Sequence, residues 1–474
     1  MSALDIFHHP LDRPKVALVL CLLVWKLLLF CIAIVSPGAG YDTSTTLLQL
    51  DGQLTNLTSK SGLGFPLKLE SLVRWDAIYF TQIAQNGYVW EQEWAFGWGF
   101  TRLIALISKG LTSCGYPRSI GTETIAGILI SHVSHLCSVL VLHELTLTVY
   151  RRSSAHQLSK VSFLAACLHI ISPAGMFLSA PYAESSFSLL NLAGYYLYAK
   201  AKTSARVQNS KGDALIVFSG ILFGVGTTFR GNGLFSGLIL IYDAVSSMSK
   251  IVHSANIQAN MRNLSVVCLS GVLMACIAIL PQFLAYKEYC TNVSAETPVR
   301  PWCWNWVPSI YAWVQKKYWG VGFLKYWTLS NLPLFILAAP MLYILLQSGY
   351  RAWRVETFMI VVPSQEESKG YPGEVTRTSS TGHDLHIDSA IACRFAIPQI
   401  VLATLALTSY HVQIINRLSS GYPVWYWWLA SLILEDRKSS FWGMKFHYTS
   451  VVIRWIVIYA MVQGGLFASF LPPA

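Results

Sequence analysis

Long apolar stretches recur along the whole chain and are separated by polar segments. The first, residues 16–35, is interrupted only by Lys26 and is long enough to cross the roughly 30 Å hydrocarbon core of a bilayer as a helix. A cleaved signal peptide would have an apolar core of roughly 7–15 residues, so this stretch indicates an uncleaved signal-anchor with a cytosolic N-terminus. Further apolar stretches, several of them short, lie at 124–149, 160–180, 184–199, 214–229, 232–247, 264–286, 328–348, 390–410, 422–434 and 449–470. The pattern predicts an all-α polytopic membrane protein with about 9–11 transmembrane helices.

The composition agrees with this pattern. Hydrophobic residues make up 54% of the chain and charged residues 12%, about half of the roughly 25% typical of soluble domains. Mean hydropathy is +0.46. These values exclude a soluble enzyme, a disordered chain and a secreted disulfide scaffold. The net charge of +11 does not indicate a nucleic-acid partner, because the sequence has no zinc-finger or RNA-binding motif.

The distribution of basic residues supports the cytosolic N-terminus. When the sides are alternated from that end, 18 of the 34 Lys and Arg residues fall in cytosolic segments, 13 in the longer segments on the other side and three within spans. This is the bias that the positive-inside rule predicts. We therefore expect one multi-pass domain over residues 1–474, with two long lumenal loops at 36–123 and 287–327 and a flexible cytosolic loop at 349–389.

Three Asn-X-Ser/Thr sequons bear on the same orientation. Asn56 and Asn292 lie in the two long loops and are expected to be glycosylated. Asn263 falls at a cytosolic helix end and is expected to stay bare.

Seven of the ten cysteines lie in apolar stretches, where cysteine acts as a small hydrophobic side chain. Cys290 and Cys303 share the second lumenal loop, where an oxidising compartment allows a disulfide between them, and Cys114 is the alternative partner. No cysteine pair has the C-x-x-C spacing of a zinc site.

A group of metal-ligating residue types occurs in the predicted cytosolic loop, at His383, Asp384, His386 and Asp388. Solvated polar loops often collect such residues without binding anything. We therefore expect no metal site.

The first long loop contains Arg74, Trp75 and Asp76 ahead of a helix-like stretch that ends at Gly87. One interpretation of Asp76 is an N-cap whose carboxylate accepts hydrogen bonds from the first free amides of that helix. The other is a carboxylate at the membrane surface that takes a proton from a sugar hydroxyl. The two roles are compatible, because a helix N-terminus keeps a carboxylate ionised.

Two polar turns interrupt apolar surroundings on the same predicted side. Glu184 ends the turn Pro-Tyr-Ala-Glu, and Arg230 and Asn232 lie in the turn Phe-Arg-Gly-Asn-Gly. Ionisable groups at this depth are costly and are usually functional. Arg230 either reaches the lipid head groups or pairs with Glu184, or it contacts a lipid-linked phosphate, which suits the fork of a guanidinium.

Tryptophans gather in the second long loop and again in a late apolar stretch. They are typical of an interfacial aromatic belt, although tryptophan also stacks on sugar rings. They are Trp302, Trp304, Trp306, Trp313, Trp319 and Trp327, followed by Trp425, Trp427 and Trp428. The sequence has no Walker A loop, no G-x-G-x-x-G and no Asp-x-Asp, so a sugar donor would be lipid-linked rather than a nucleotide.

These motifs, in this order, resemble the fungal GPI mannosyltransferase 2 family. The resemblance rests on Arg74-Trp75-Asp76, on the two polar turns, on His411-Val412-Gln413 and on Pro-Val-Trp-Tyr at 423–426, and it runs from the first apolar stretch to the C-terminus. One departure is Gly-Trp-Gly-Phe at 97–100, where many relatives have a proline-containing run.

The resemblance implies a GT-C-type glycosyltransferase of the endoplasmic reticulum membrane with a lumenal active site. It implies transfer of the second mannose, in α-1,6 linkage, from dolichol-phosphate-mannose to a GPI precursor lipid, without a cofactor and with a small membrane partner subunit. Trp75 and Asp76 carry over as active-site residues. The candidate contacts to the donor phosphate or sugar are Arg74, Glu184, Arg230, Asn232, His411 and Arg417.

Two alternatives remain open at this stage. Another GT-C glycosyltransferase would share the acidic lumenal loop but would use a different acceptor. A solute transporter or lipid scramblase would instead place its ionisable groups inside the bundle, around a substrate path.

Overall fold

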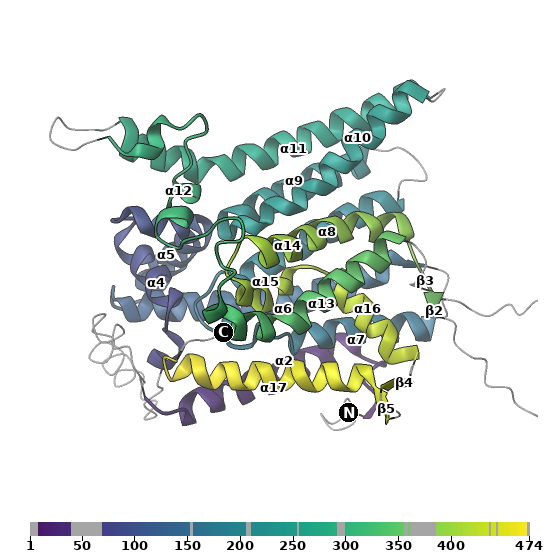
Figure 1. Ribbon diagram of the computed structural model, residues 1–474, viewed down its shortest axis with the longest axis horizontal. Helices are drawn as coiled ribbons and strands as arrows, with labels where there is room; N and C mark the ends of the chain where they lie inside the picture. Colours follow the sequence, from purple (N-terminus) through teal and green to yellow (C-terminus); the bar gives the residue numbers. More distant parts are fainter. Residues whose placement is uncertain are drawn as a thin grey trace, which may run out of the picture.

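The computed structural model describes residues 8–38, 69–151, 155–204, 210–253, 256–291, 299–354, 359–360, 385–435, 438–441 and 444–471. Each of the eleven predicted apolar stretches carries one helix of a bundle whose members run along a common direction (Figure 1). These helices are α2 (Pro14–Val35), α6 (Ile120–Val149), α7 (Ala155–Ile170), α8 (Glu184–Ser204), α9 (Ser210–Phe229), α10 (Leu238–His253), α11 (Ile257–Tyr286), α13 (Leu332–Arg354), α14 (Ser389–Thr408), α16 (Val424–Glu435) and α17 (Tyr448–Ala468). The all-α polytopic class is confirmed.

Eight helical segments within the described ranges are long and apolar enough to cross a membrane. The helices α7, α8 and α16 are not among them. Two of the three are short, with 16 residues in α7 and 12 in α16. The third, α8, is long enough but carries polar side chains that face protein: Ser188 donates to the carbonyl of Ser420 at 3.1 Å, and Asn191 donates to that of Gly421 at 2.9 Å. A helix covered by its neighbours need not be apolar all round, because protein rather than lipid satisfies its polar groups.

The two predicted lumenal loops contain short helices that gather at one end of the bundle (Figure 1). The first loop forms η2 (Leu69–Leu72), α4 (Asp76–Asn86), η3 (Glu91–Ala95) and α5 (Trp98–Ser113). The second forms η6 (Lys287–Thr291), η7 (Pro301–Trp304) and α12 (Ile310–Lys317). Both loops therefore lie on the same side, as their alternation along the chain predicts.

Short strands lie at the opposite end, where the predicted cytosolic segments meet (Figure 1). The strand β3 (Leu385–Ile387) pairs antiparallel with both β1 (Tyr150–Arg151) and β2 (Met359–Ile360), and β4 (Lys438–Phe441) pairs with β5 (Met444–His447). Most of the predicted flexible loop, including His383 and Asp384, falls outside the described residues. Asp388, at its end, is the N-cap of α14. The described residues contain no group of three or more His, Cys, Asp or Glu placed to hold a metal ion.

Short helical turns link the long helices inside the bundle. They are η4 (Gly175–Leu178), η5 (Gly231–Gly237), η8 (Leu329–Asn331), η9 (Val412–Ile414), α15 (Ile415–Leu418) and η10 (Ser419–Gly421). Lys26, in the middle of α2, reaches one of these turns and donates to the carbonyl of Leu178 at 2.7 Å and to the hydroxyl of Ser179 at 2.9 Å. The one interruption of the first apolar stretch is therefore buried and hydrogen-bonded.

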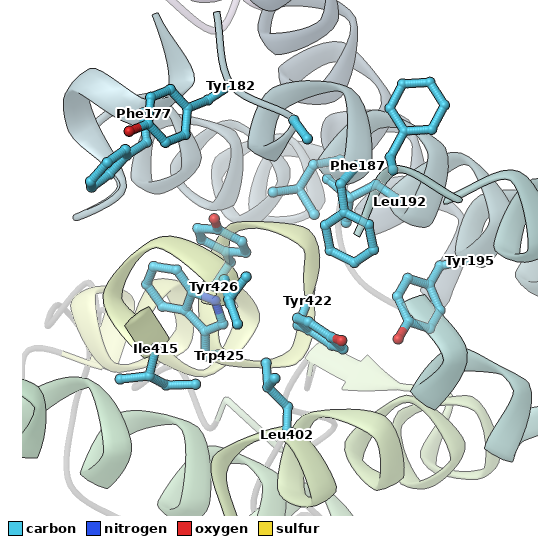
Figure 2. Close-up of a cluster of buried hydrophobic side chains, with 14 of the residues drawn as sticks. Phe177, Tyr182, Phe187, Leu192, Tyr195, Leu402, Ile415, Tyr422, Trp425 and Tyr426 are labelled. Atoms are coloured by element: carbon cyan, nitrogen blue, oxygen red, sulfur yellow. The ribbon is translucent and has the colours of Figure 1, made fainter. Parts of the chain in front are cut away.

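Large aromatic side chains fill the interior around α8 and α16 (Figure 2). Trp425 and Trp427 are fully buried; their indole N–H groups donate to the carbonyl of Ser419 and to the hydroxyl of Thr146. Trp428 is buried as well. The interpretation of these three tryptophans as an interfacial belt is wrong, because protein on all sides replaces the lipid–water boundary.

Candidate active site

Four charged side chains converge at the end of the bundle that carries the short helices. Asp76 is the first residue of α4, Glu184 the first of α8, Arg230 precedes η5, and Arg417 lies in α15. All four are among the predicted site residues, but nothing in their spacing joined Arg417 to the others. We call them the four-residue cluster.

Arg417 lies between the two carboxylates. Its Nη1 donates to Oδ2 of Asp76 at 3.1 Å, and its Nε lies 3.5 Å from Oε1 of Glu184. Arg230 donates through Nη1 to the same Glu184 oxygen at 2.7 Å. The predicted pairing of Arg230 with Glu184 is therefore confirmed. Two carboxylates and two guanidinium groups balance each other, which limits the large cost of burying charge.

The Arg417 guanidinium is a permanent cation. Burial disfavours its charged form, but the carboxylates of Glu184 and Asp76 outweigh burial and raise the pKa of Arg417 above its ordinary value. The guanidinium also lies over the rings of Phe177 and Tyr182, at 4.9 and 5.9 Å. Cation–π contacts of this kind stabilise the guanidinium in addition to its ion pairs with the two carboxylates.

Asp76 is more exposed than its partners, because 28% of its side chain is accessible against 1% for Glu184. The N-cap of α4 is Trp75, so the interpretation of Asp76 as the N-cap is wrong. Asp76 instead occupies the first helical position, where the helix dipole attracts negative charge, and it pairs with Arg417. It is therefore the carboxylate of the cluster that a substrate hydroxyl can reach.

The backbone at Trp75 is strained. Its φ of 54° lies in the left-handed region, which side chains other than glycine seldom adopt. This conformation turns the chain from η2 into α4, and the Trp75 ring lies 5.2 Å from that of Phe470. Packing maintains this strain at the position directly before the partly exposed Asp76 carboxylate.

Arg74 is directed away from the four-residue cluster. Its Nε donates to the carbonyl of Ala468 at 3.3 Å, and its guanidinium lies 5.2 Å from the centre of the Phe470 ring. Its own carbonyl accepts a hydrogen bond from Tyr182 at 3.2 Å. Arg74 thus ties α4 to the end of α17.

Asn232 and His411 also have partners outside the cluster. The amide of Asn232 donates to the hydroxyl of Tyr422 at 3.2 Å. His411 donates through Nε2 to the carbonyl of Trp319 at 2.8 Å and stacks on Tyr326. Their roles as substrate contacts stay predictions.

Gly97 and Gly99, in the Gly-Trp-Gly-Phe run that departs from the family pattern, pack directly beside this site. An added Cβ at Gly97 would overlap with the Phe229 carbonyl, and one at Gly99 would overlap with the Thr228 side chain. The two glycines therefore let the start of α5 reach the turn that carries Arg230.

The second predicted lumenal loop is held in place by a disulfide and a buried tryptophan. Cys290 and Cys303 are bridged, and Cys114 is free, so the first of the two predicted pairings is confirmed. Trp302 is fully buried and donates through Nε1 to Oε1 of Glu91 at 2.9 Å. Tyr318 donates to the other oxygen of Glu91 at 3.0 Å.

The assignment of Trp302 to an aromatic belt is therefore also wrong. No role was predicted for Glu91, and no local signal marked it, because its partner Trp302 lies 211 positions away in the chain. Among the other tryptophans of this loop, Trp304 and Trp306 are exposed, at 80% and 97%. The sequons at Asn56 and Asn292 lie outside the described residues.

The fold and the cluster define a polytopic membrane protein with a candidate active site where its helices end. Over residues 15–474 the sequence matches the family model described as "Mannosyltransferase (PIG-V)". The chain belongs to this mannosyltransferase family and is a glycosyltransferase. Membership of an enzyme family argues against the transporter alternative.

Curated relatives named GPI mannosyltransferase 2 are similar over almost the whole chain. The protein from Aspergillus fumigatus is 41% identical, covering 98% of this chain and 94% of its own. That from Gibberella zeae is 40% identical, covering 98% of both chains. Among solved structures, the apo oligosaccharyltransferase of Archaeoglobus fulgidus aligns with 96% of this chain and 56% of its own, at 12% identity and a TM-score of 0.45.

Proposed function

We propose that this enzyme transfers the second mannose, in α-1,6 linkage, from dolichol-phosphate-mannose to a GPI precursor lipid in the lumen of the endoplasmic reticulum. The relatives' name supports the place in GPI-anchor synthesis. The observation that carries the chemistry is the pairing of the partly exposed Asp76 carboxylate with Arg417, beside the charge-balanced pair of buried Glu184 and partly buried Arg230. The same proposal includes a lumenal site, a cytosolic N-terminus and the GT-C architecture. It also includes a small membrane partner subunit, as in fungal relatives.

In this mechanism Asp76 is the general base. Its carboxylate takes the proton of the acceptor's 6-hydroxyl while that oxygen attacks the anomeric carbon of the donor mannose. The bond from that carbon to the phosphate oxygen breaks in the same step, so the configuration inverts. Arg417 orients the Asp76 carboxylate through their hydrogen bond, and proton removal of this kind contributes roughly 10²- to 10⁴-fold to the rate.

Arg230 is the candidate ligand of the leaving phosphate. Negative charge grows on that group in the transition state, and a fixed guanidinium stabilises it without reorganising. Arg230 donates to Glu184 through Nη1. The other N–H groups of its guanidinium can then face a phosphate. The donor carries a single phosphodiester charge, so the scheme requires no metal.

The test is transfer of labelled mannose from dolichol-phosphate-mannose to a GPI precursor bearing one mannose, in solubilised membranes. We expect Asp76→Asn to lose about 10²- to 10⁴-fold in activity at unchanged expression. The matched control is Asp213→Asn, which breaks an exposed ion pair with Arg262 and should transfer mannose normally. Transfer by Asp76→Asn at the wild-type rate would exclude the general-base role. If the wild-type enzyme transfers no mannose to an intact acceptor, either the proposed acceptor is wrong or a required subunit is missing.

A further inference from the structure

A groove of about 240 Å³ lies beside α17, on the side that faces α13. Leu337 of α13 forms one wall; Trp455, Ile458, Val462 and Leu466, at helical spacing on one face of α17, form the other. Ile458 and Val462 are 60% and 56% exposed within a candidate membrane span. The groove is therefore open to the bilayer and almost wholly apolar.

One polar side chain in this groove is buried and unsatisfied. Gln463 lines the groove at 2% exposure, and neither its amide nitrogen nor its amide oxygen has a hydrogen-bond partner among the described residues. A buried carboxamide without partners is costly and rare in native structures. A hydrocarbon tail of bulk lipid cannot satisfy it, whereas a ligand with an apolar chain and a polar end can.

The polar side of the groove leads to the four-residue cluster. Tyr459, one turn before Gln463, lines the groove, and its side chain interacts with that of Asn416, next to Arg417. Phe467, one turn after Gln463, packs on the rings of Phe177 and Tyr182, at 5.6 and 5.7 Å. These are the two rings that lie under the Arg417 guanidinium. Gln463 thus lies one layer of side chains from the paired charges.

We propose that this groove binds the hydrocarbon chain of the lipid-phosphate donor, and that the Gln463 carboxamide donates to a phosphate oxygen while the donor enters, before the phosphate reaches Arg230. The inference rests on the proposed donor, dolichol-phosphate-mannose. A single groove between two helices suits one isoprenoid chain better than the paired tails of a diacyl acceptor. The nearby Arg417 cation also suits the anionic end of the chain. The groove thereby delivers the sugar–phosphate bond to the side of the cluster where α17 ends.

Photo-cross-linking tests the location directly. The photoreactive residue p-benzoylphenylalanine replaces Ile458 in the groove or, as the matched control, Val451, which is 51% exposed on α17 outside the groove. The full chain in membranes is irradiated with tritiated dolichol-phosphate-mannose. We expect about ten-fold more label at position 458 than at 451, displaced by unlabelled dolichyl phosphate and not by phosphatidylinositol. Equal labelling at both positions would mean bulk lipid only, and displacement by phosphatidylinositol would assign the groove to the acceptor; either result overturns the proposal.

Kinetics test the role of Gln463. We expect Gln463→Leu to raise the KM for dolichol-phosphate-mannose about ten-fold, because one hydrogen bond to a charged group is lost, and to leave the KM for the acceptor unchanged. Ile458→Trp, which fills the groove, should do the same, whereas Val451→Trp should change neither value. A rise in the acceptor KM, or unchanged values for both groove variants, would contradict the proposal.

Cross-linking needs no acceptor, so it separates this inference from the proposed reaction. A wild-type enzyme that transfers no mannose but is labelled at position 458 contradicts the reaction only. Normal mannose transfer with equal labelling at positions 458 and 451 contradicts only the proposal that the groove binds the donor's hydrocarbon chain.

Discussion

At the scale of single residues, the cluster shows which parts of a site a sequence can supply. Asp76, Glu184 and Arg230 each lie in a short local motif, and the pairing of Arg230 with Glu184 was among the interpretations of those motifs. Arg417 was one of six candidate substrate contacts and was not linked to Asp76, because their contact spans 341 positions of the chain. No local pattern encodes a contact of that range, so the residue that joins the carboxylates could be identified only in the folded bundle.

Glu184 provides a prediction about the stability of the cluster. Glu184→Gln leaves two partly buried guanidinium groups without the buried carboxylate that they share, and loss of one partner from a buried ion pair costs up to about 3–5 kcal/mol. The matched control is Glu144→Gln, whose exposed pair with Lys15 should contribute less than about 1 kcal/mol. Thermal unfolding in detergent, followed by tryptophan fluorescence, should give a much lower midpoint for Glu184→Gln. Equal midpoints for the two variants would show that the buried pair does not support the fold.

Trp75 provides a second prediction, from its backbone alone. Trp75→Gly and Trp75→Ala both remove the ring that packs on Phe470, but only glycine adopts the left-handed φ without strain. We expect the glycine variant to be more stable than the alanine variant by roughly 1 kcal/mol. The same unfolding assay measures the difference. An alanine variant as stable as the glycine variant, or more stable, would show that the backbone at position 75 is not strained.

At the scale of elements, Glu91 joins η3 of the first long loop to η7 and to the C-cap of α12 in the second. Hydropathy located both loops but could not foresee their contact. The composition of the second loop is that of an interfacial belt, and nothing in its spacing distinguishes buried Trp302 from exposed Trp306. Burial of one tryptophan depends on where Glu91 lies in space, which the sequence does not specify locally.

Replacing each of these two tryptophans tests this junction. Trp302→Phe keeps a large ring but leaves the buried Glu91 carboxylate without one donor, at a cost of about 1.5–3 kcal/mol. Trp306→Phe, at a position that is 97% exposed, should be neutral. Limited proteolysis of the second loop should speed up in the first variant and stay at the wild-type rate in the second. Identical digestion rates would mean that the hydrogen bond to Glu91 does not hold the loops together.

At the scale of the whole molecule, the helices were predictable because the bilayer imposes length and hydropathy on each span. All eleven predicted stretches carry helices, while the boundaries shift where polar caps and turns end them, as at α6, which begins at Ile120 rather than at residue 124. The number of full crossings was harder to predict. A helix such as α8 is enclosed by protein, so its composition does not show whether it crosses the membrane.

The sequons test the orientation of the whole molecule. Asn263 lies in α11, which begins at the end of the bundle opposite α12 (Figure 1), and its carboxamide donates to the hydroxyl of Ser247 at 2.6 Å. We expect Asn56→Gln and Asn292→Gln each to remove one glycan and Asn263→Gln to remove none. Gel mobility with and without a glycosidase measures this. A glycan on Asn263 would invert the proposed topology.

The hydrogen bonds of Lys26 have a consequence for biosynthesis. Their acceptor in the turn after α7, the Leu178 carbonyl, lies 152 positions later in the chain, which is about 8–30 s of translation at roughly 5–20 residues per second. During that interval the ammonium group lacks its final acceptors, and a lysine at the centre of a span costs about 2.5–3.5 kcal/mol on insertion. The mean hydropathy of α2 is 2.9 over its most apolar window even with Lys26 included, and this offsets the cost. The first helix is therefore inserted early by the ribosome–translocon complex but is anchored in its final place only after α7 and the turn that follows it have been synthesised.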